Sequence, residues 1–397
     1  MRDVYVIGSS MTNFGKHPGR TLRSLATEAT EGALHDASMD AAAVGSVYFS
    51  NAVAGIVTGQ ETIRGQVALR DTGLLGKTII NVENACASGS TAVHLGWLSV
   101  ASGQVDTAIA VGAEKLTHSD KSVTFRAYAS GVDLDEIDED YTTDRLSIAA
   151  GMGGHSAFMD LYAQHARSYM DQTGATQADL AAVVTKARQF GARNPKAQFR
   201  QELTVEEVLA SREIAWPLTL PMCSPIGDGA ASIVLGSREA AERAGGPLVR
   251  VRATMVTSGS QTEPFAVERL SQQLYNETSV APEDLDVVEL HDAAAPAELE
   301  YYEALGLCAP GEAAKLLASG DTSLGGRTYV NSSGGLLAKG HPVGATGCAQ
   351  LVEIADQLKG RCGDRQKDGA RLGLAHNAGG SIFGDSGALV MTLLERV

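Results

Sequence analysis

Short runs of apolar and β-branched residues alternate with longer stretches of helical pattern along most of the chain. The first run is VYVIGSS at 4–10, a helical pattern follows at 21–37, and the alternation continues to the strand pattern TAIAVGAEK at 107–115. It returns at 231–237 and continues to the last predicted strand, GALVMTLLER at 387–396. Strands that alternate with helices predict a sheet with helices on its faces, so we expect an α/β fold.

Between these two α/β stretches the alternation breaks down over residues 116–217, which are rich in Asp, Glu, Tyr and Met. We interpret this segment as an insertion of loops and helices on top of the core. The predicted domains are 1–115 for the first part of the N-terminal half, 116–217 for the insertion, 218–247 for the completion of that half, and 248–397 for the C-terminal half.

The two halves also resemble each other. CASGSTAVHLGWLSVASGQVDTAIAVGAEK begins a helix after a turn and runs into a strand, and GATGCAQLVEIADQLKG followed by RLGLAHNAGG does the same. This match aligns Cys86 with Gly344. Chance similarity in a chain rich in Gly and Ala is the alternative, but we favour a duplication.

Composition narrows the possible functions. The formal net charge of -15 argues against a broad surface for nucleic-acid phosphates, so a basic site for an anionic substrate must be local. Five cysteines without a CxxC pair fit a reducing compartment and no structural zinc. The first residues lack a cationic leader, no apolar run approaches the roughly 20 residues of a membrane span, and no peroxisomal signal ends the chain. We therefore expect a cytoplasmic protein that binds neither nucleic acid nor membrane.

The segment NVENACASGST places Cys86 where a predicted strand turns into a helix rich in small residues. An isolated cysteine is usually a small buried apolar residue, and this is the alternative interpretation. Free N–H groups and the dipole at a helix start stabilise a thiolate, and small neighbours leave room for an acyl group. The pattern is typical of a nucleophile elbow that carries sulfur instead of oxygen.

Two histidines are candidate partners for Cys86. His341 lies in GGLLAKGHPVGATG at 334–347, where five glycines suggest a backbone that approaches something closely. It is the natural general base for Cys86 or its imidazolium partner, and a histidine in a surface turn is the alternative. His291 ends a predicted buried strand in VVELHDAAAP, the position where α/β proteins collect polar site residues, and Asp292 beside it is a candidate helix cap.

Two further segments carry polar candidates. LAHNAGGSIFGDSG contains His376, which could be structural or functional, and glycines at 379–380 that could present an amide to an oxyanion. TKARQFGARNPKAQFR at 185–200 contains five cations and no acid. It is either a solvated helix face or a site for the phosphates of coenzyme A. The cations of this run are Lys186, Arg188, Arg193, Lys196 and Arg200.

Taken together, these motifs resemble the thiolase superfamily over essentially the whole chain. NACASGS is similar to its acylation-site signature and GGLLAKGHPVGATG to its GHP motif. The resemblance implies two βαβαβαββ halves in a five-layer αβαβα sandwich, a loop domain inserted in the first half, and a homodimer. It also implies that His341 activates Cys86, and that the amides of Cys86 and Gly380 form the oxyanion hole for the thioester.

The chain departs from conventional thiolases at two motifs. It has HDAA at 291–294 in place of Asn-Glu-Ala-Phe, and HNAG at 376–379 in place of Cys-x-Gly. The pair is similar to sterol-carrier-protein-type thiolases and to bacterial and archaeal acetyl-CoA acetyltransferase-like relatives. Eukaryotic members place the second acid/base cysteine at the position of Ala293, so His291 or His341 must move that proton here, directly or through water. Family members with HDA and no second cysteine often work with a small OB-fold, zinc-ribbon partner subunit. The chain looks similar to thiolases for bulky acyl chains, such as benzoylsuccinyl-CoA thiolase.

We therefore predict a thiolase that cleaves a 3-ketoacyl-CoA with coenzyme A through an acyl-Cys86 thioester. We expect it to degrade a bulky, branched or aromatic acyl chain, with coenzyme A as co-substrate and neither a tightly bound cofactor nor a metal. The alternatives are a biosynthetic thiolase that forms acetoacetyl-CoA, a retro-aldolase of side-chain β-hydroxyacyl-CoA, and a non-catalytic acyl-CoA-binding scaffold. A retro-aldolase needs no nucleophile, so the intact NACASG argues against it.

Overall fold

The strands of the central sheet consist mostly of small and β-branched residues, because helices cover both of its faces. The computed structural model describes residues 1–135 and 156–397. β4 and β7 are buried at every position, which is typical of strands covered on both sides. The strands are β1 (Tyr5–Met11), β2 (Ser46–Ser50), β3 (Thr78–Val82), β4 (Thr107–Glu114), β7 (Gly229–Gly236), β8 (Val249–Thr257), β9 (Val287–Glu289), β10 (Tyr329–Val330), β11 (Leu372–Ile382) and β12 (Asp385–Arg396).

The two halves of the chain have the same sheet topology. The strand order is β10-β9-β11-β12-β8-β1-β7-β4-β2-β3, and the halves meet where β1 pairs with β8. Numbered along the chain, the strands of each half follow the order 3-2-4-5-1 from the outer edge inward. The pairings are also equivalent, with parallel outer strands and antiparallel inner ones. This shared topology confirms the duplicated fold that the sequence predicted.

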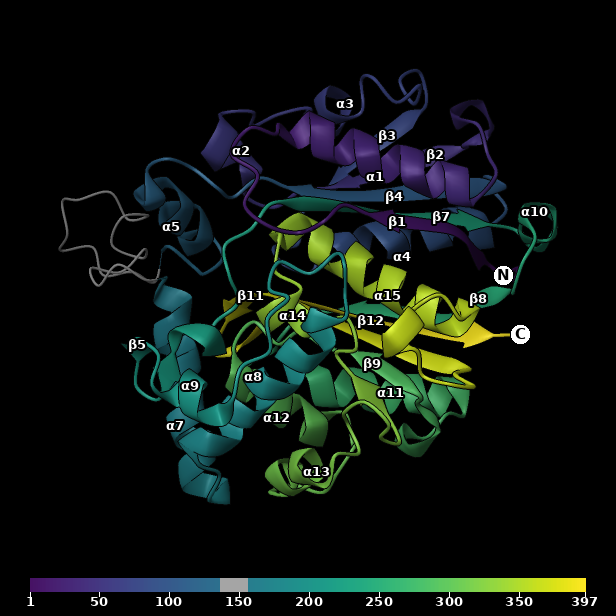
Figure 1. Ribbon diagram of the computed structural model, residues 1–397. Helices are drawn as coiled ribbons and strands as arrows, with labels where there is room; N and C mark the ends of the chain where they lie inside the picture. The colour runs from purple at the N-terminus through teal and green to yellow at the C-terminus, as the bar shows by residue number, and fades with distance from the viewer. Residues whose placement is uncertain (136–155) are drawn as a thin grey trace.

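The helices complete five layers, which can be followed in Figure 1. α1 lies on the outer side of the N-terminal strands, α4 and α15 lie between the two halves, and α11 and α12 lie on the outer side of the C-terminal strands. The helices of these layers are α1 (Leu22–Asp36), α2 (Ala54–Thr58), α3 (Arg64–Ala68), α4 (Ser88–Ala101), α10 (Arg238–Ala244), α11 (Ala266–Thr278), α12 (Ala295–Ala304), α13 (Ala313–Ser319), α14 (Gly335–Ala338) and α15 (Thr346–Lys359).

The middle layer requires glycine at the two positions where its helices cross. α4 and α15 cross so closely that a Cβ on Gly89 would lie 2.8 Å from the amide nitrogen of Cys348. A Cβ on Gly347 would lie 2.3 Å from the amide nitrogen of Ser90. These helices therefore bring the residues at their N-terminal ends, one from each half, to the same point in the molecule.

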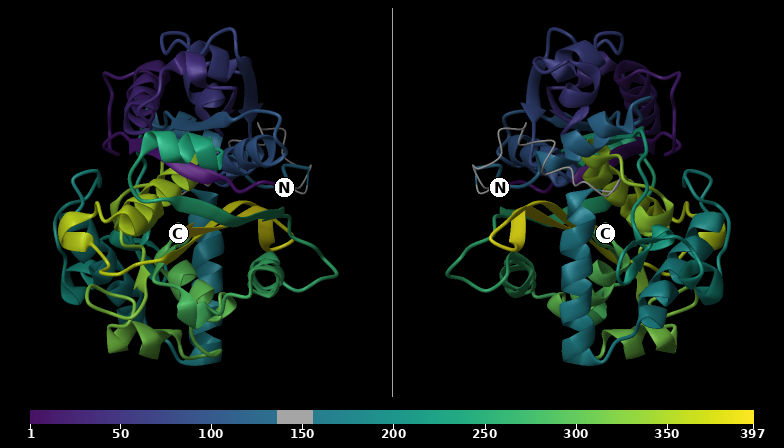
Figure 2. Two further views of the ribbon diagram at one scale, coloured as in Figure 1. Left: turned by 90° about the vertical axis from the view of Figure 1, so that its right-hand side faces the viewer. Right: turned by 90° about the vertical axis from the view of Figure 1, so that its left-hand side faces the viewer.

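The segment between β4 and β7 carries additional elements, of which α5 lies near α2 of the N-terminal half and α7, α8 and α9 lie beside the C-terminal half (Figures 1 and 2). They are α5 (Lys121–Ala129), α7 (Ala157–Thr173), α8 (Gln177–Ala192), α9 (Val205–Leu209), β5 (Glu213–Ala215) and β6 (Leu218–Thr219). The helix that the sequence predicts from Cys86 begins two residues later, at Ser88. Within the described residues, no helix has the length and apolar character that a bilayer crossing requires.

Candidate active site

Cys86 lies in the tight turn that joins β3 to α4. Ala85 before it has φ of +47°, in the left-handed region that residues with a Cβ rarely adopt. The turn is held because Ser88 Oγ accepts from the amide of Asn84 at 2.9 Å and donates to the carbonyl of Ala85 at 2.6 Å. A strained residue ahead of a reactive side chain is the geometry of a nucleophile elbow.

The segment of β11 that ends the HNAG motif lies directly over this turn. A Cβ on Gly379 would lie 2.9 Å from the amide nitrogen of Cys86, so only glycine fits there. Gly380 has φ of +67°, and its amide points at the sulfur of Cys86. The amide of Cys86 itself also points at that sulfur. The two amides named by the sequence resemblance therefore converge on one atom.

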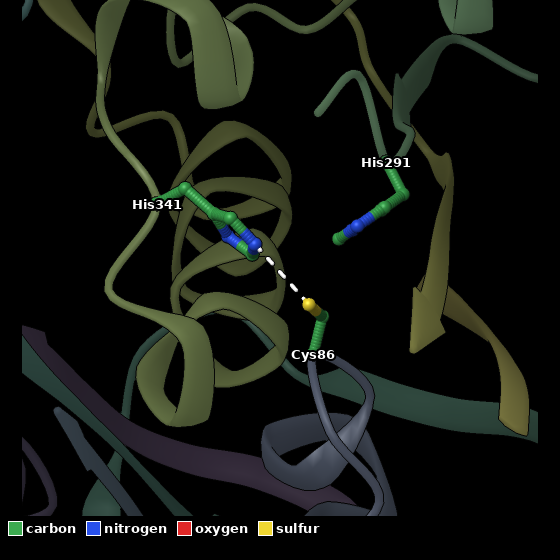
Figure 3. A group of neighbouring side chains, drawn as sticks. All are labelled: Cys86, His291 and His341. Carbon is green, nitrogen blue, oxygen red and sulfur yellow. Dashed lines mark hydrogen bonds between the residues drawn. The ribbon is translucent and has the colours of Figure 1, made fainter. Parts of the chain in front are cut away.

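His341 is the direct partner of the Cys86 thiol. Its Nε2 lies 3.3 Å from Sγ, as the dashed line in Figure 3 shows. Its Nδ1 lies 2.7 Å from the hydroxyl of Thr346, which donates its own proton to the carbonyl of Pro342 at 3.1 Å. The hydroxyl can therefore only accept from Nδ1–H, which leaves the lone pair of Nε2 facing the thiol. His341 is thus oriented as a base toward Cys86.

His291 has the opposite hydrogen-bonding role. Its Nδ1 lies 3.2 Å from the amide nitrogen Nδ2 of Asn377, whose Oδ1 accepts from the hydroxyl of Ser90 at 2.9 Å. An amide nitrogen can only donate, so Nδ1 of the neutral imidazole accepts and Nε2 carries the proton. The His291 and His341 rings meet edge to face, with centroids 5.1 Å apart. The site therefore combines one imidazole acceptor with one imidazole donor.

Burial determines the resting protonation of this site. It raises the pKa of Cys86 to about 12, although the amides of Gly380 and Cys86 lower it. Burial also lowers the pKa of His291 to about 3, and it lowers the pKa of His341 well below its usual value, to which the nearby His291 contributes. The resting site is a neutral thiol between two neutral imidazoles. This corrects the expectation of a thiolate stabilised by the helix start, because desolvation outweighs the helix dipole here.

The same three side chains could hold a metal ion. Donor atoms of Cys86, His291 and His341 lie within 4.8 Å of one another, a set that suits a thiophilic cation. Such an ion would require Nε2 of His291 to give up the proton that its contact with Asn377 assigns to it. The hydrogen-bond pattern fits acid–base chemistry at an acyl carbon better.

Comparison with known proteins agrees with this geometry. The family model described as thiolase, N-terminal domain, matches residues 4–212, and the model described as thiolase C-terminal domain-like matches residues 250–392. The chain belongs to the thiolase family.

Individual relatives match over nearly their full length. The benzoylsuccinyl-CoA thiolase subunit BbsB of Thauera aromatica is 38% identical, over 96% of this chain and 95% of that protein. An acetyl-CoA acetyltransferase of Methanothermobacter thermautotrophicus is 37% identical, over 96% of this chain and 97% of that protein. Among solved structures, a chain of the Ltp2-ChsH2(DUF35) aldolase superposes with a TM-score of 0.81 over 99% of this chain and 98% of that one; at 24% identity, this likeness concerns the fold.

The site of this thiolase opens into a large cavity beside the inserted segment. The cavity has a volume of about 2700 Å³, and its lining includes Cys86, His291, His341 and Gly380. Residues of α5 and α7, the end of α12 and the β11–β12 turn form its other walls. The nucleophile therefore lies at the wall of a cavity that is large enough to admit a substrate molecule.

Several residues around the site serve to connect its loops. Asp292 accepts from the amide of Leu336 at 2.7 Å, so it caps α14, the short helix that precedes His341, rather than the helix that follows it. His376 is buried, accepts from the amide of His291 at 3.4 Å, and contacts the Tyr301 ring in a tilted arrangement with centroids 4.3 Å apart. Sequence reasoning missed Asn377 and Thr346, although Asn377 directly follows His376 and Thr346 lies in the same motif as His341.

The basic run at 185–200 does not form one cationic face. Lys186 is buried in an ion pair with Glu298 at 2.5 Å, and its ammonium also donates to the carbonyl of Val330 at 2.9 Å. Arg193 pairs with Glu202 at 2.8 Å on the surface. The proposal that Lys186 binds phosphate is therefore wrong, because this cation is already neutralised inside the protein. Arg188 is buried and lines the cavity, whereas Lys196 is half-buried and Arg200 is exposed.

The structural role of Lys186 can be tested by measuring the free energy of unfolding of two variants. Replacing Lys186 with methionine should destabilise the fold by about 3–5 kcal/mol, because it leaves the Glu298 carboxylate buried without its partner. Replacing Arg193 with glutamine, which breaks an exposed pair, should change stability by less than about 1 kcal/mol. Chemical denaturation of both variants provides the comparison. Equal stability of the two variants would contradict the structural role of Lys186.

Proposed function

We propose that this thiolase cleaves a 3-ketoacyl-CoA with coenzyme A through an acyl-Cys86 thioester, in the degradation of a bulky or aromatic acyl chain. The observation that carries the proposal is the 3.3 Å contact between Sγ of Cys86 and the unprotonated Nε2 of His341 at the cavity wall. The name of the Thauera relative, benzoylsuccinyl-CoA thiolase, supports the aromatic class of acyl chain.

In the first half-reaction, His341 removes the thiol proton while Sγ attacks the 3-keto carbon. The keto oxygen becomes an oxyanion that accepts from the amides of Cys86 and Gly380. When the bond between C2 and C3 breaks, its electron pair forms the enolate of the shortened acyl-CoA, and Nε2–H of His291 donates to the enolate oxygen. His341 then returns its proton to C2, which releases the acyl-CoA and leaves the acyl group on Cys86.

In the second half-reaction, coenzyme A enters and His341 removes the proton from its thiol. The sulfur of coenzyme A attacks the acyl carbon, and the oxyanion again accepts from the two amides. The intermediate collapses with Cys86 as the leaving group, and Sγ regains its proton from His341. The second acid/base cysteine of conventional thiolases is not required in this scheme, because His341 carries the proton in both steps.

We also propose that the enzyme works as a cytoplasmic homodimer with a small OB-fold, zinc-ribbon partner subunit. The Thauera relative is named as a subunit, and the name of the solved aldolase contains ChsH2(DUF35) beside Ltp2. The biosynthetic, retro-aldolase and scaffold alternatives are less well supported, because the contact between Cys86 and His341 serves a nucleophile and the cavity exceeds the needs of an acetyl group.

The decisive experiment is to trap the acyl-enzyme. The protein is mixed with an aromatic 3-ketoacyl-CoA without free coenzyme A, and the adduct is located by mass spectrometry of peptides. We expect an aroyl group on Cys86 and release of the shortened acyl-CoA. Cleavage without any covalent adduct would favour the retro-aldolase, and binding without cleavage would favour the scaffold.

The role of His341 predicts a distinct pH profile for alkylation of Cys86 by iodoacetamide. In the wild type, the lowered pKa keeps His341 unprotonated through the neutral range, where it removes the thiol proton during the reaction, so the rate should vary little with pH. In His341→Ala only the pre-formed thiolate reacts, and because burial raises the pKa of this thiol to about 12, the rate should rise about tenfold per pH unit through neutrality. Identical profiles for the two proteins would exclude His341 as the base.

A further inference from the structure

Of the two buried cations of the basic run, Lys186 has an ion-pair partner, whereas Arg188 has no hydrogen-bond or ion-pair partner among the described residues. Its side chain is only 8% exposed, and within the described residues no carboxylate, carbonyl or hydroxyl accepts a hydrogen bond from it. Its Nε is fully buried and unsatisfied. Burial lowers the pKa of this guanidinium to about 10, which reflects the cost of holding an uncompensated charge inside the protein.

The surroundings of Arg188 hold it in a fixed position at the cavity wall. Its guanidinium carbon lies 4.1 Å from the centre of the Phe199 ring, a cation–π contact. The amide of Phe199 donates to the carbonyl of Ala338 at 3.0 Å, and the amide of Gln198 donates to that of Lys339 at 3.1 Å. Arg188 is therefore packed against the strand-like segment that runs beside the loop leading to His341.

Among the lysines and arginines that line the cavity, Arg188 alone is buried within the described part of the chain. The others, Lys16, Lys121 and Arg212, are exposed. The phosphates of coenzyme A carry several negative charges and suit a group of exposed cations, whereas one buried guanidinium suits one planar monoanion. Of the four other cations of the basic run, Lys186 and Arg193 are paired with glutamates, and Lys196 and Arg200 are not among the residues that line the cavity.

We infer that Arg188 binds a carboxylate on the acyl part of the substrate, so that the enzyme acts on 3-ketoacyl-CoA esters whose acyl chain carries a free acid. This inference rests on the proposed function and adds to it a specificity-determining residue and a chemical class of substrate. The guanidinium offers two parallel N–H groups that match a carboxylate, and Phe199 fixes the plane in which they lie. The substrate acid supplies the charge partner that the described residues do not provide.

The test uses two matched substrates, an aromatic 3-ketoacyl-CoA with a carboxymethyl group at C2 and the same compound with that acid replaced by its carboxamide. Arg188→Gln should lower kcat/KM for the acid at least about 10²-fold more than for the amide, because a desolvated charge-assisted pair is lost. The matched control is Arg212→Gln, which removes an exposed cation of the same cavity and should lower both values by the same factor. Arg188→Lys keeps the charge without the fork and should show a preference for the acid that is reduced about tenfold.

Two other outcomes would overturn the inference. Equal losses for the acid and the amide in Arg188→Gln would place the anion on coenzyme A, and no loss for either would leave Arg188 without a substrate role. If Arg188→Gln does not fold, the ratio of kcat/KM for the acid to kcat/KM for the amide is measured in Arg188→Lys instead. Acyl-Cys86 formation by the wild type from the amide is measured in parallel, because its failure would refute the proposed function rather than the carboxylate site.

Discussion

Replacing Cys86 with alanine should reduce cleavage of a 3-ketoacyl-CoA by at least about 10⁴-fold, the scale on which loss of a catalytic nucleophile acts. The reason is geometric. Sγ of Cys86 is the atom that Nε2 of His341 faces at 3.3 Å and on which the amides of Cys86 and Gly380 converge. Steady-state kinetics combined with mass spectrometry of the enzyme should show loss of turnover together with loss of the acyl adduct.

The appropriate control is Cys223→Ala, because Cys223 also lines the cavity. Its thiol donates to the carbonyl of Thr219 at 3.6 Å, and burial raises its pKa to about 12 without a histidine to take its proton. This variant should retain the acyl adduct on Cys86. An adduct on Cys223 in the wild type, or turnover that survives in Cys86→Ala, would contradict the assignment of the nucleophile.

The fold and the reacting side chains were predictable because their signals are local. A run such as TAIAVGAEK shows by its own residues that both faces of a strand are covered, and β4 is buried throughout. Cys86 lies in a turn of small residues and His341 in a glycine-rich turn, each ahead of a helix, so the sequence around each indicates a backbone that other groups can approach closely. The repeat of this pattern predicted a duplication, and in the structure the equivalent helices α4 and α15 bring both turns together.

The ion pairing and protonation of these side chains were not predictable, because they depend on groups that are far away in the sequence. Lys186 and Arg188 look equivalent in the chain, yet one meets Glu298 on α12 and the other meets only an aromatic ring. The helix start suggested a stabilised thiolate, but the burial that raises its pKa comes from packing of the whole cavity wall. The proton positions of the two histidines follow from Asn377 and Thr346, whose hydrogen bonds only the folded structure defines.

Because the two histidines have opposite roles, His291→Ala should affect the two half-reactions differently. This variant should still form acyl-Cys86 from a simple activated thioester, because that half-reaction uses the nucleophile, His341 and the two amides. It should lose about 10²–10³-fold in cleavage of a 3-ketoacyl-CoA, since the enolate oxygen no longer has the Nε2–H donor. Single-turnover acylation and steady-state cleavage, measured on the same preparation, separate the two half-reactions.

The pH dependence distinguishes a donor from an acid in this experiment. Burial lowers the pKa of His291 to about 3, so its imidazole is neutral at every pH at which the enzyme would be assayed, and Nε2–H donates without titrating. The pH profiles of the cleavage rate should therefore show the same ionisations in the wild type and in His291→Ala. Asn377→Leu removes the partner of Nδ1 and should weaken cleavage in the same direction by a smaller factor, with acylation again preserved. If His291→Ala loses both half-reactions equally, His291 supports the structure of the site rather than the enolate.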